Sequence, residues 1–142
     1  MVLSDVNLLV YAFRNDTARH SAARRWLFET LNGGGSFAVS EFVLSSVVRI
    51  VTNPRIFYDA SPLETAIQFA NAIRNHPRAK VLSAGKRHWQ IFVDLCRATE
   101  ARGNVVPDAY LAALAIEQDI ELATADRGFK RFPGLRWTNP LA

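Results

Sequence analysis

Hydrophobic and polar residues follow two patterns along this chain: short apolar runs, and longer stretches in which apolar residues recur every three or four positions. Short runs bounded by turn residues predict buried strands, and the longer spacing predicts amphipathic helices. The runs predict five short strands, at residues 1–4, 36–39, 79–83, 120–124 and 135–140.

Helical spacing predicts helices between these strands. One ambiguous stretch, residues 40–54, is rich in β-branched residues, which favours a strand, but its length, Ser40 as a cap and its closing Asn-Pro favour a helix. We predict a helix there. The others are a helical stretch after the first strand and helices at about 18–31, 61–77, 86–101 (closed by Gly103) and 105–119.

Strands that alternate with helices, without tight hairpin signals, predict a parallel sheet. We therefore expect an α/β fold, a three-layer sandwich with a short, mostly parallel central sheet flanked by helices. A length of 142 residues, 49% of them hydrophobic, is enough for one core. A single domain over residues 1–142 is expected.

Cysteine and histidine limit the possible chemistry. Cys96 is the only cysteine, so an intramolecular disulfide is excluded, and no zinc spacing links it to the histidines. We expect His20, His76 and His88 to lie isolated on the surface. No apolar stretch has the length of a membrane span or the pattern of a signal peptide, so a cytoplasmic protein without membrane contact is expected.

The chain carries 17 basic and 13 acidic residues, a net charge of +4, and 14 of the basic residues are arginines. The planar arginine fork matches phosphate geometry, which favours a nucleic-acid partner. The charges form no tract. They gather weakly in two clusters, Arg19 with Arg24 and Arg25, and Arg127 with Lys130 and Arg131.

Four acidic residues follow predicted strands or open the next helix, and in parallel sheets ligands bind at the carboxyl ends of strands. Each also has an ordinary interpretation as a helix cap or first-turn residue. Asp108 lacks a capping-box partner because Leu111 stands three residues later, and Glu41 shares a helical face with apolar residues, so it is predicted to turn inward. The four are Asp5, Glu41, Asp108 and Asp126.

Together these acids indicate a metal site. No basic residue lies within two positions of Asp5, Glu41 or Asp108, and converging carboxylates repel one another unless a proton or a cation neutralises them. Oxygen ligands without nearby histidine or cysteine point to Mg²⁺, with Mn²⁺ able to replace it. Such ions activate water and stabilise leaving oxygens in phosphodiester cleavage.

Four segments together resemble the PIN-domain nucleases, in particular VapC-type toxins of toxin–antitoxin pairs: "SDVNLLVYAF", "SE" at 40–41, "NVVPDAYLAALAIE" and "LATADRGFKRF". The resemblance covers nearly the whole chain. It implies a ribonuclease with Asp5, Glu41, Asp108 and Asp126 around Mg²⁺, supported by the polar residues Asn7, Asn104 and Thr124. It also implies a cognate VapB-type antitoxin that covers the acidic pocket, and a homodimer.

The basic cluster after Asp126 has a predicted role beside such a site. Phe129 and Phe132, three residues apart, are expected to anchor the segment to the core. Arg127, Lys130 and Arg131 are then predicted to contact the RNA backbone.

Other functions remain alternatives. A haloacid-dehalogenase-like phosphohydrolase needs a second aspartate two residues after Asp5, where this chain has Asn7, and a receiver domain needs a lysine that Lys80, Lys86 and Lys130 do not supply. A non-catalytic RNA-binding module explains the arginine excess but gives no reason for converging acids. Divalent-dependent RNA cleavage separates it from a nuclease.

Overall fold

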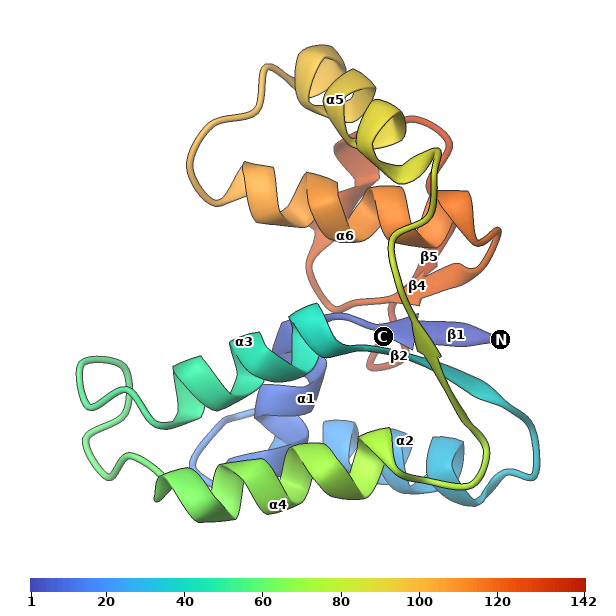
Figure 1. Ribbon diagram of the computed structural model, residues 1–142. Coiled ribbons are helices and arrows are strands. Elements are labelled where there is room, and N and C mark those ends of the chain that lie inside the picture. Colours follow the sequence, from blue (N-terminus) through green and yellow to red (C-terminus); the bar gives the residue numbers. More distant parts are fainter.

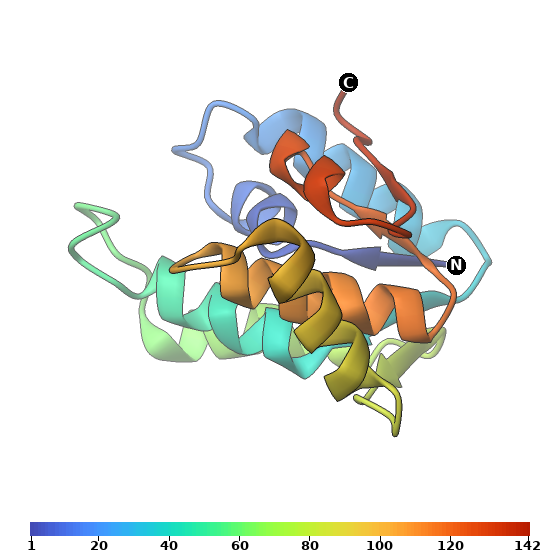
Figure 2. The ribbon, with the colours of Figure 1, turned by 90° about the horizontal axis from the view of Figure 1, so that it is seen from above.

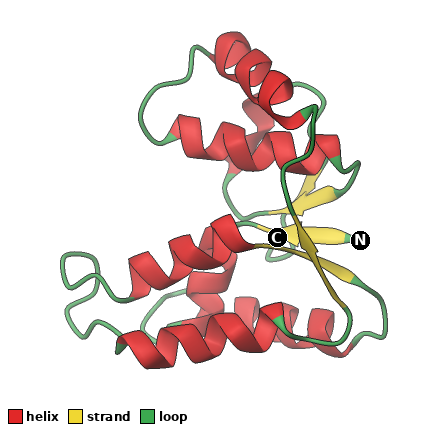
Figure 3. Cartoon of the chain, in the orientation of Figure 1, coloured by secondary structure: helices red, strands yellow, loops and turns green.

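A five-stranded sheet with helices on both sides forms the fold in the computed structural model, which describes residues 1–142 (Figure 1, Figure 3). Every pair of neighbouring strands is parallel, in the order β3-β2-β1-β4-β5. The predicted α/β sandwich is confirmed. The strands are β1 Val2–Ser4, β2 Phe37–Ser40, β3 Ala79–Leu82, β4 Glu121–Ala123 and β5 Trp137–Thr138.

The helices form two groups. In Figure 1, α5 and α6 lie above the strands and α1 to α4 lie below them, and the view in Figure 2 places α5 over α6. The ambiguous stretch after Ser40 is a helix, as predicted, because Ser40 Oγ accepts a hydrogen bond from Val43 N–H at 3.3 Å and caps it. The helices are α1 Val6–Phe13, α2 His20–Asn32, α3 Glu41–Val51, α4 Leu63–Arg74, α5 His88–Thr99 and α6 Val105–Glu117, with a 3₁₀ helix, η1, at Arg127–Arg131.

The strand order fixes where a ligand can bind. From central β1 the chain adds β2 and β3 on one side, then returns across the sheet to place β4 and β5 on the other. Such a reversal opens a crevice at the carboxyl ends of the two strands that flank it. Here those strands are β1 and β4, and Asp5 and Thr124 are the residues that follow them.

One core joins both helix groups to the sheet. Helix α6 supplies Ala109, Ala112, Ala113 and Ala115, all fully buried, and these small side chains let its backbone approach the strands and α5 closely. The apolar character of α6 around its whole circumference is therefore a matter of packing. No helix of the chain is both long enough and apolar enough to cross a bilayer.

Two predictions about α5 are wrong. His88 is only 2% exposed: its Nε2 lies 2.9 Å from the carbonyl oxygen of Tyr110, and its ring stands edge-on to the Tyr110 ring at 4.3 Å. The helix also ends before Gly103, because Glu100 takes a left-handed conformation (φ 50°) as its C-cap. The burial of His88 comes from the packing of α5 on α6, which the local sequence does not display.

Candidate active site

A polar pocket of about 430 Å³ lies at the carboxyl ends of β1 and β4. Three of the four predicted acids line it: Asp5 after β1, Asp108 in the first turn of α6 and Asp126 just before η1. Asn7 and Asn104 line it as well, and both are exposed. Residues separated by up to 121 positions thus meet in one crevice.

Asp5 has two roles at once. It is 4% exposed and caps α1, because its Oδ1 accepts a hydrogen bond from Val6 N–H at 2.6 Å. Burial raises the pKa of the Asp5 carboxyl, the hydrogen bonds from Thr124 and Val6 oppose the rise, and the charge of Asp126 adds to it. The carboxylate is held rigidly and faces a cluster of its own sign.

Thr124 connects two of the aspartates. Its hydroxyl is fully buried, donates to Asp5 Oδ2 at 2.7 Å and accepts from Asp126 N–H at 3.0 Å. Asp126 in turn caps η1, since its Oδ1 accepts from Gly128 N–H at 2.7 Å. The threonine therefore ties the Asp5 carboxylate to the Asp126 backbone, and the Gly128 amide orients the Asp126 carboxylate.

Asp108 is the most perturbed of the three. The half-buried Asp108 side chain makes no hydrogen bond, and burial together with the charges of Asp5 and Asp126 raises its pKa to about 6, against a smaller lowering by Arg131. Such mutual repulsion requires that the aspartates lie near one another. It is also the state that a bound cation relieves.

Glu41 does not belong to this group. It is exposed and lines a different hollow, where Arg74 Nε donates to its Oε2 at 2.8 Å. The prediction that Glu41 turns inward and joins the aspartates is corrected. The face of α3 that carries Glu41 packs beside α4. The partner that the local sequence lacks is Arg74 of α4, 33 residues away.

Another face of α3 reaches the pocket. Phe42, Ser46, Arg49 and Ile50 line it, at the spacing i, i+4, i+7 and i+8 expected for one helical stripe. Sequence reasoning missed these residues because it followed Glu41. The helical spacing was the available signal, but only the fold shows which stripe of α3 faces the aspartates.

The three aspartates are the type of ligand that a hard divalent ion prefers, but their side chains are not close enough together to surround one. Carboxylate oxygens are the ligands that Mg²⁺ and Mn²⁺ prefer, and Asp108 and Asp126 Oδ2 have no hydrogen-bond partner in the protein. No three Asp, Glu, His or Cys side chains of the chain are gathered closely enough to hold a metal ion between them. Binding therefore needs small side-chain movements or water ligands.

The η1 segment brings positive charge to the edge of the pocket. Phe129 and Phe132 are 1% and 3% exposed, with ring centroids 5.8 Å apart, so the predicted aromatic anchor is confirmed. Arg127, Lys130 and Arg131 are exposed, and Arg131 Nε donates to Gly128 O at 2.8 Å. Their contact with RNA stays a prediction.

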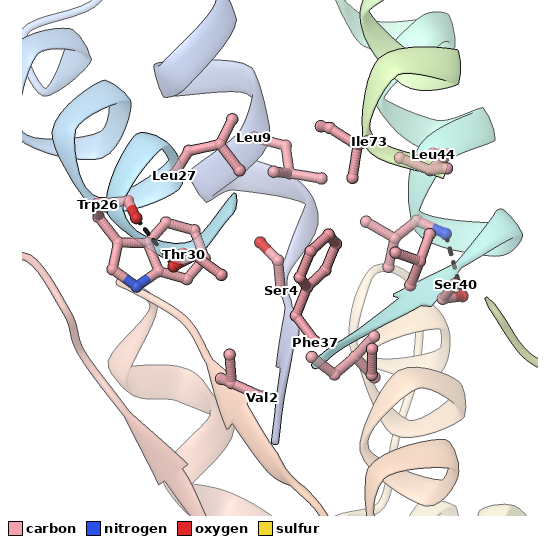
Figure 4. A pocket seen from close by; sticks show the side chains of 14 residues that line it. Val2, Ser4, Leu9, Trp26, Leu27, Thr30, Phe37, Ser40, Leu44 and Ile73 are labelled. Carbon is pink, nitrogen blue, oxygen red and sulfur yellow. Dashed lines mark hydrogen bonds between the residues drawn. The ribbon is translucent and has the colours of Figure 1, made fainter. Parts of the chain in front are cut away.

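A second hollow near the sheet is a packing cavity. It encloses about 30 Å³ beneath β1 and β2, and Figure 4 shows Leu9, Leu27, Phe37 and Ile73 around it. Its lining is almost wholly hydrocarbon, and such a cavity offers a water molecule no partners. The acidic pocket, which gathers the aspartates, is therefore the candidate active site.

With this geometry established, comparison with known proteins identifies the family. The model of the PIN domain matches residues 2–135. The chain belongs to the PIN-domain family. The resemblance inferred from the four sequence segments is confirmed.

Relatives of this chain include VapC proteins of mycobacteria. The VapC ribonuclease Mb2897 of Mycobacterium bovis is 40% identical over 141 residues, which cover 99% of this chain and 96% of that protein. Ribonuclease VapC25 of Mycobacterium tuberculosis is 36% identical over 140 residues, with 99% of each chain covered.

Solved PIN-domain structures share the fold at lower identity. VapBC2 from Rickettsia felis, bound to a DNA fragment from its promoter, superposes with a TM-score of 0.72 at 20% identity, covering 98% of both chains. VapC20 of Mycobacterium tuberculosis, a sarcin–ricin loop cleaving toxin, gives 0.68 at 20% identity, covering 96% of this chain and 99% of that one.

Proposed function

We propose that this PIN domain is a metal-dependent ribonuclease toxin in which Asp5, Asp108 and Asp126 hold Mg²⁺, or Mn²⁺ in its place. The observation that carries the proposal is the convergence of three carboxylates, one with its pKa raised to about 6, in a pocket of a protein whose net charge is +4. The ribonuclease names of its VapC relatives supply the substrate class.

Each residue has a defined task in this proposal. When bound, the ion neutralises phosphate oxygens and activates water for attack at phosphorus. Thr124 holds the Asp5 carboxylate and the Asp126 backbone, and Gly128 N–H holds the Asp126 carboxylate, so both carboxylates are oriented before substrate binds. Asp108 contributes an unpaired, partly desolvated carboxylate, whose negative charge gains most from a cation.

The proposed regulation is inhibition by a VapB-type antitoxin, and the VapBC structure among the structural neighbours supports a partner of this kind. A groove beside α1 and α2 supports a peptide partner. It measures about 710 Å³ and contains Phe13, Phe69 and the 67% exposed Phe28. The arginines Arg24 and Arg25 line the same groove and suit an acidic peptide.

A pair of carboxyl-to-amide substitutions tests the assignment. Asp126→Asn is expected to reduce Mg²⁺-dependent RNA cleavage by about a hundredfold or more, because it removes a ligand of the ion that would stabilise the transition-state charge. Glu41→Gln, the matched control outside the pocket, is expected to retain cleavage within about threefold, because its partner is Arg74.

The assay uses protein purified free of any antitoxin, a labelled RNA substrate, and Mg²⁺, Mn²⁺ or EDTA. The absence of cleavage by the parent protein with either ion, alongside RNA binding, supports the non-catalytic RNA-binding module instead. Equal losses in Asp126→Asn and Glu41→Gln contradict the three-aspartate site.

A further inference from the structure

The segment between α3 and α4, residues 52–62, forms a long loop at one end of the molecule (Figure 1). We call it the 52–62 loop. Its outer side carries large exposed side chains: Ile56 is 52% exposed and the Tyr58 side chain is fully exposed. Exposed aromatic and aliphatic side chains at the tip of an ordered loop indicate a binding surface.

Arg14 fixes this loop from below. The 9% exposed guanidinium donates from Nη1 to the backbone oxygen of Asp59 at 2.6 Å and to Ser61 Oγ at 3.0 Å, and its Cζ stands 4.2 Å from the centroid of the Phe57 ring. Asp16 completes the arrangement by accepting from Arg14 Nε at 2.9 Å and pairing with Nη2.

Backbone contacts hold the loop from its own side. The Asn53 carbonyl oxygen accepts from both Ile56 N–H and Phe57 N–H at 3.0 Å, and Ser61 N–H donates to Val51 O at 2.8 Å. With Phe57 turned toward the core, Tyr58 is directed to the opposite, solvent side. The exposed positions of the loop are therefore preorganised.

The loop adjoins the acidic pocket. Ile56 lines that pocket together with Asp108 and Asp126, and Arg49, one helical turn before the loop, lines it too. The Arg49 side chain is exposed and makes no hydrogen bond or ion pair in the protein, and it is the Arg49 backbone oxygen that accepts from Thr52 Oγ1 at 3.4 Å. One wall of the pocket thus offers an unpaired cation close to the aspartates and hydrophobic side chains farther out.

The composition of the 52–62 loop favours binding of RNA by base stacking rather than by charged side chains. It contains one basic residue, Arg55, and one acidic residue, Asp59, so its net charge is zero. An exposed aromatic ring binds a nucleobase through its π-face whatever the base, and such stacking is compatible with a neutral loop.

We propose that the Arg14-clamped 52–62 loop extends the wall of the acidic pocket as a nucleotide-binding surface, with Tyr58 stacking on a base of the RNA outside the pocket and Arg49 contacting the backbone. This inference rests on the proposed ribonuclease function. Arg14 acts as a positioning residue, because it contacts the loop and not the pocket.

Binding of a fluorescein-labelled, mixed-sequence, single-stranded RNA 12-mer tests Tyr58, measured by fluorescence anisotropy in an Asp108→Asn background that prevents cleavage. Tyr58→Ser is expected to weaken binding about tenfold, while Tyr58→Phe keeps the ring and stays within about twofold of the parent. Phe28→Ser, an exposed aromatic in the other groove, is the matched control and is expected to leave RNA binding unchanged.

Cleavage kinetics separate the loop from the catalytic centre. Tyr58→Ser is expected to raise KM with little change in kcat, and the double variant Tyr58→Ser/Asp16→Asn is expected to lose less than the product of its single effects, because Asp16 acts only through the placement of the loop. The exposed Asp16 is used because the replacement of buried Arg14 itself risks misfolding.

Three results overturn the inference: unchanged RNA affinity in Tyr58→Ser, equal weakening by Phe28→Ser, or a Tyr58→Ser effect confined to the binding of a protein partner. If the parent protein cleaves RNA and Tyr58→Ser binds RNA as tightly as the parent, the role of the loop is refuted and the proposed function still holds. A parent that binds RNA through Tyr58 without any metal-dependent cleavage refutes the function and leaves the loop.

Discussion

At the scale of single residues, cap and catalytic ligand are not exclusive roles. Asp5 and Asp126 each use Oδ1 to cap a helix start, and each also lines the acidic pocket. A carboxylate oxygen has more than one acceptor position, so a backbone N–H does not exhaust it. The cap supplies the rigidity that a metal ligand needs.

Asp108 carries a prediction about stability and pH. Its folded-state pKa of about 6 exceeds the ordinary 3.8, so its ionisation destabilises the metal-free fold as pH rises through this window, and the full cost is present above it. Asp108→Asn removes that cost. At pH 7.5 without metal we expect the melting temperature to rise by roughly 3 °C, the effect of about 1 kcal/mol once partial exposure is allowed for.

Thermal unfolding at pH 7.5 and pH 4 measures this effect. Each sample contains either EDTA or about 5 mM Mg²⁺, which is meant to saturate the site. The gain is expected to become small near pH 4, because there the parent carboxyl is protonated in the folded state and about half protonated in the unfolded state. Mg²⁺ is expected to stabilise the parent more than the variant. Glu29→Gln, at an exposed position of α2 outside the pocket, is the matched carboxyl-to-amide control. A gain that persists unchanged at pH 4 argues against carboxylate repulsion.

At the scale of elements, η1 presents basic side chains from an aromatic anchor. Replacement of Arg127, Lys130 and Arg131 by Gln is expected to weaken RNA binding and to reduce the slope of log K against log salt by about 2, since each phosphate contact on a single strand contributes about 0.7. The buried Phe129 and Phe132 keep the segment folded.

RNA titrations over a series of NaCl concentrations provide the slope. The matched control removes the same number of charges elsewhere, with Arg19, Arg24 and Arg25 replaced by Gln. Equal slopes for the two triple variants indicate that the η1 cluster is an ordinary solvated surface. A smaller slope for the η1 variant alone supports contact with the RNA backbone.

The whole molecule combines an acidic pocket with a net charge of +4. A partner protein that inserts a cation into the pocket competes with Mg²⁺ for the same aspartates. We therefore expect the affinity of a neighbouring-gene antitoxin to fall at least severalfold at saturating Mg²⁺. Homodimer formation, implied by the family resemblance, stays a prediction.

Calorimetric titration of the antitoxin, with Mg²⁺ or with NaCl at matched ionic strength, checks the competition. The salt control separates displacement at the pocket from general screening. An affinity that responds equally to both salts refutes occlusion of the pocket, although it leaves binding in the α1–α2 groove possible.

The sequence by itself determined the alternation of strands and helices, and with it the parallel α/β sandwich. Each helix has its own spacing and boundary signals, such as Ser40 before α3, and these act over a few residues. Because ligands bind at the carboxyl ends of parallel strands, the sequence also predicts that Asp5 and Asp126, which follow predicted strands, lie at the same edge of the sheet.

Tertiary structure decided which way each side chain faces and what it meets. Glu41 and Ser46 stand on the same helix, but only the packing of α3 against α4 sends Glu41 to Arg74 and Ser46 to the pocket. In the same way, the packing of α5 against α6 buries His88 against Tyr110. Local sequence encodes the period of an element, whereas the partner of a face lies tens of residues away and is set by the sum of all contacts.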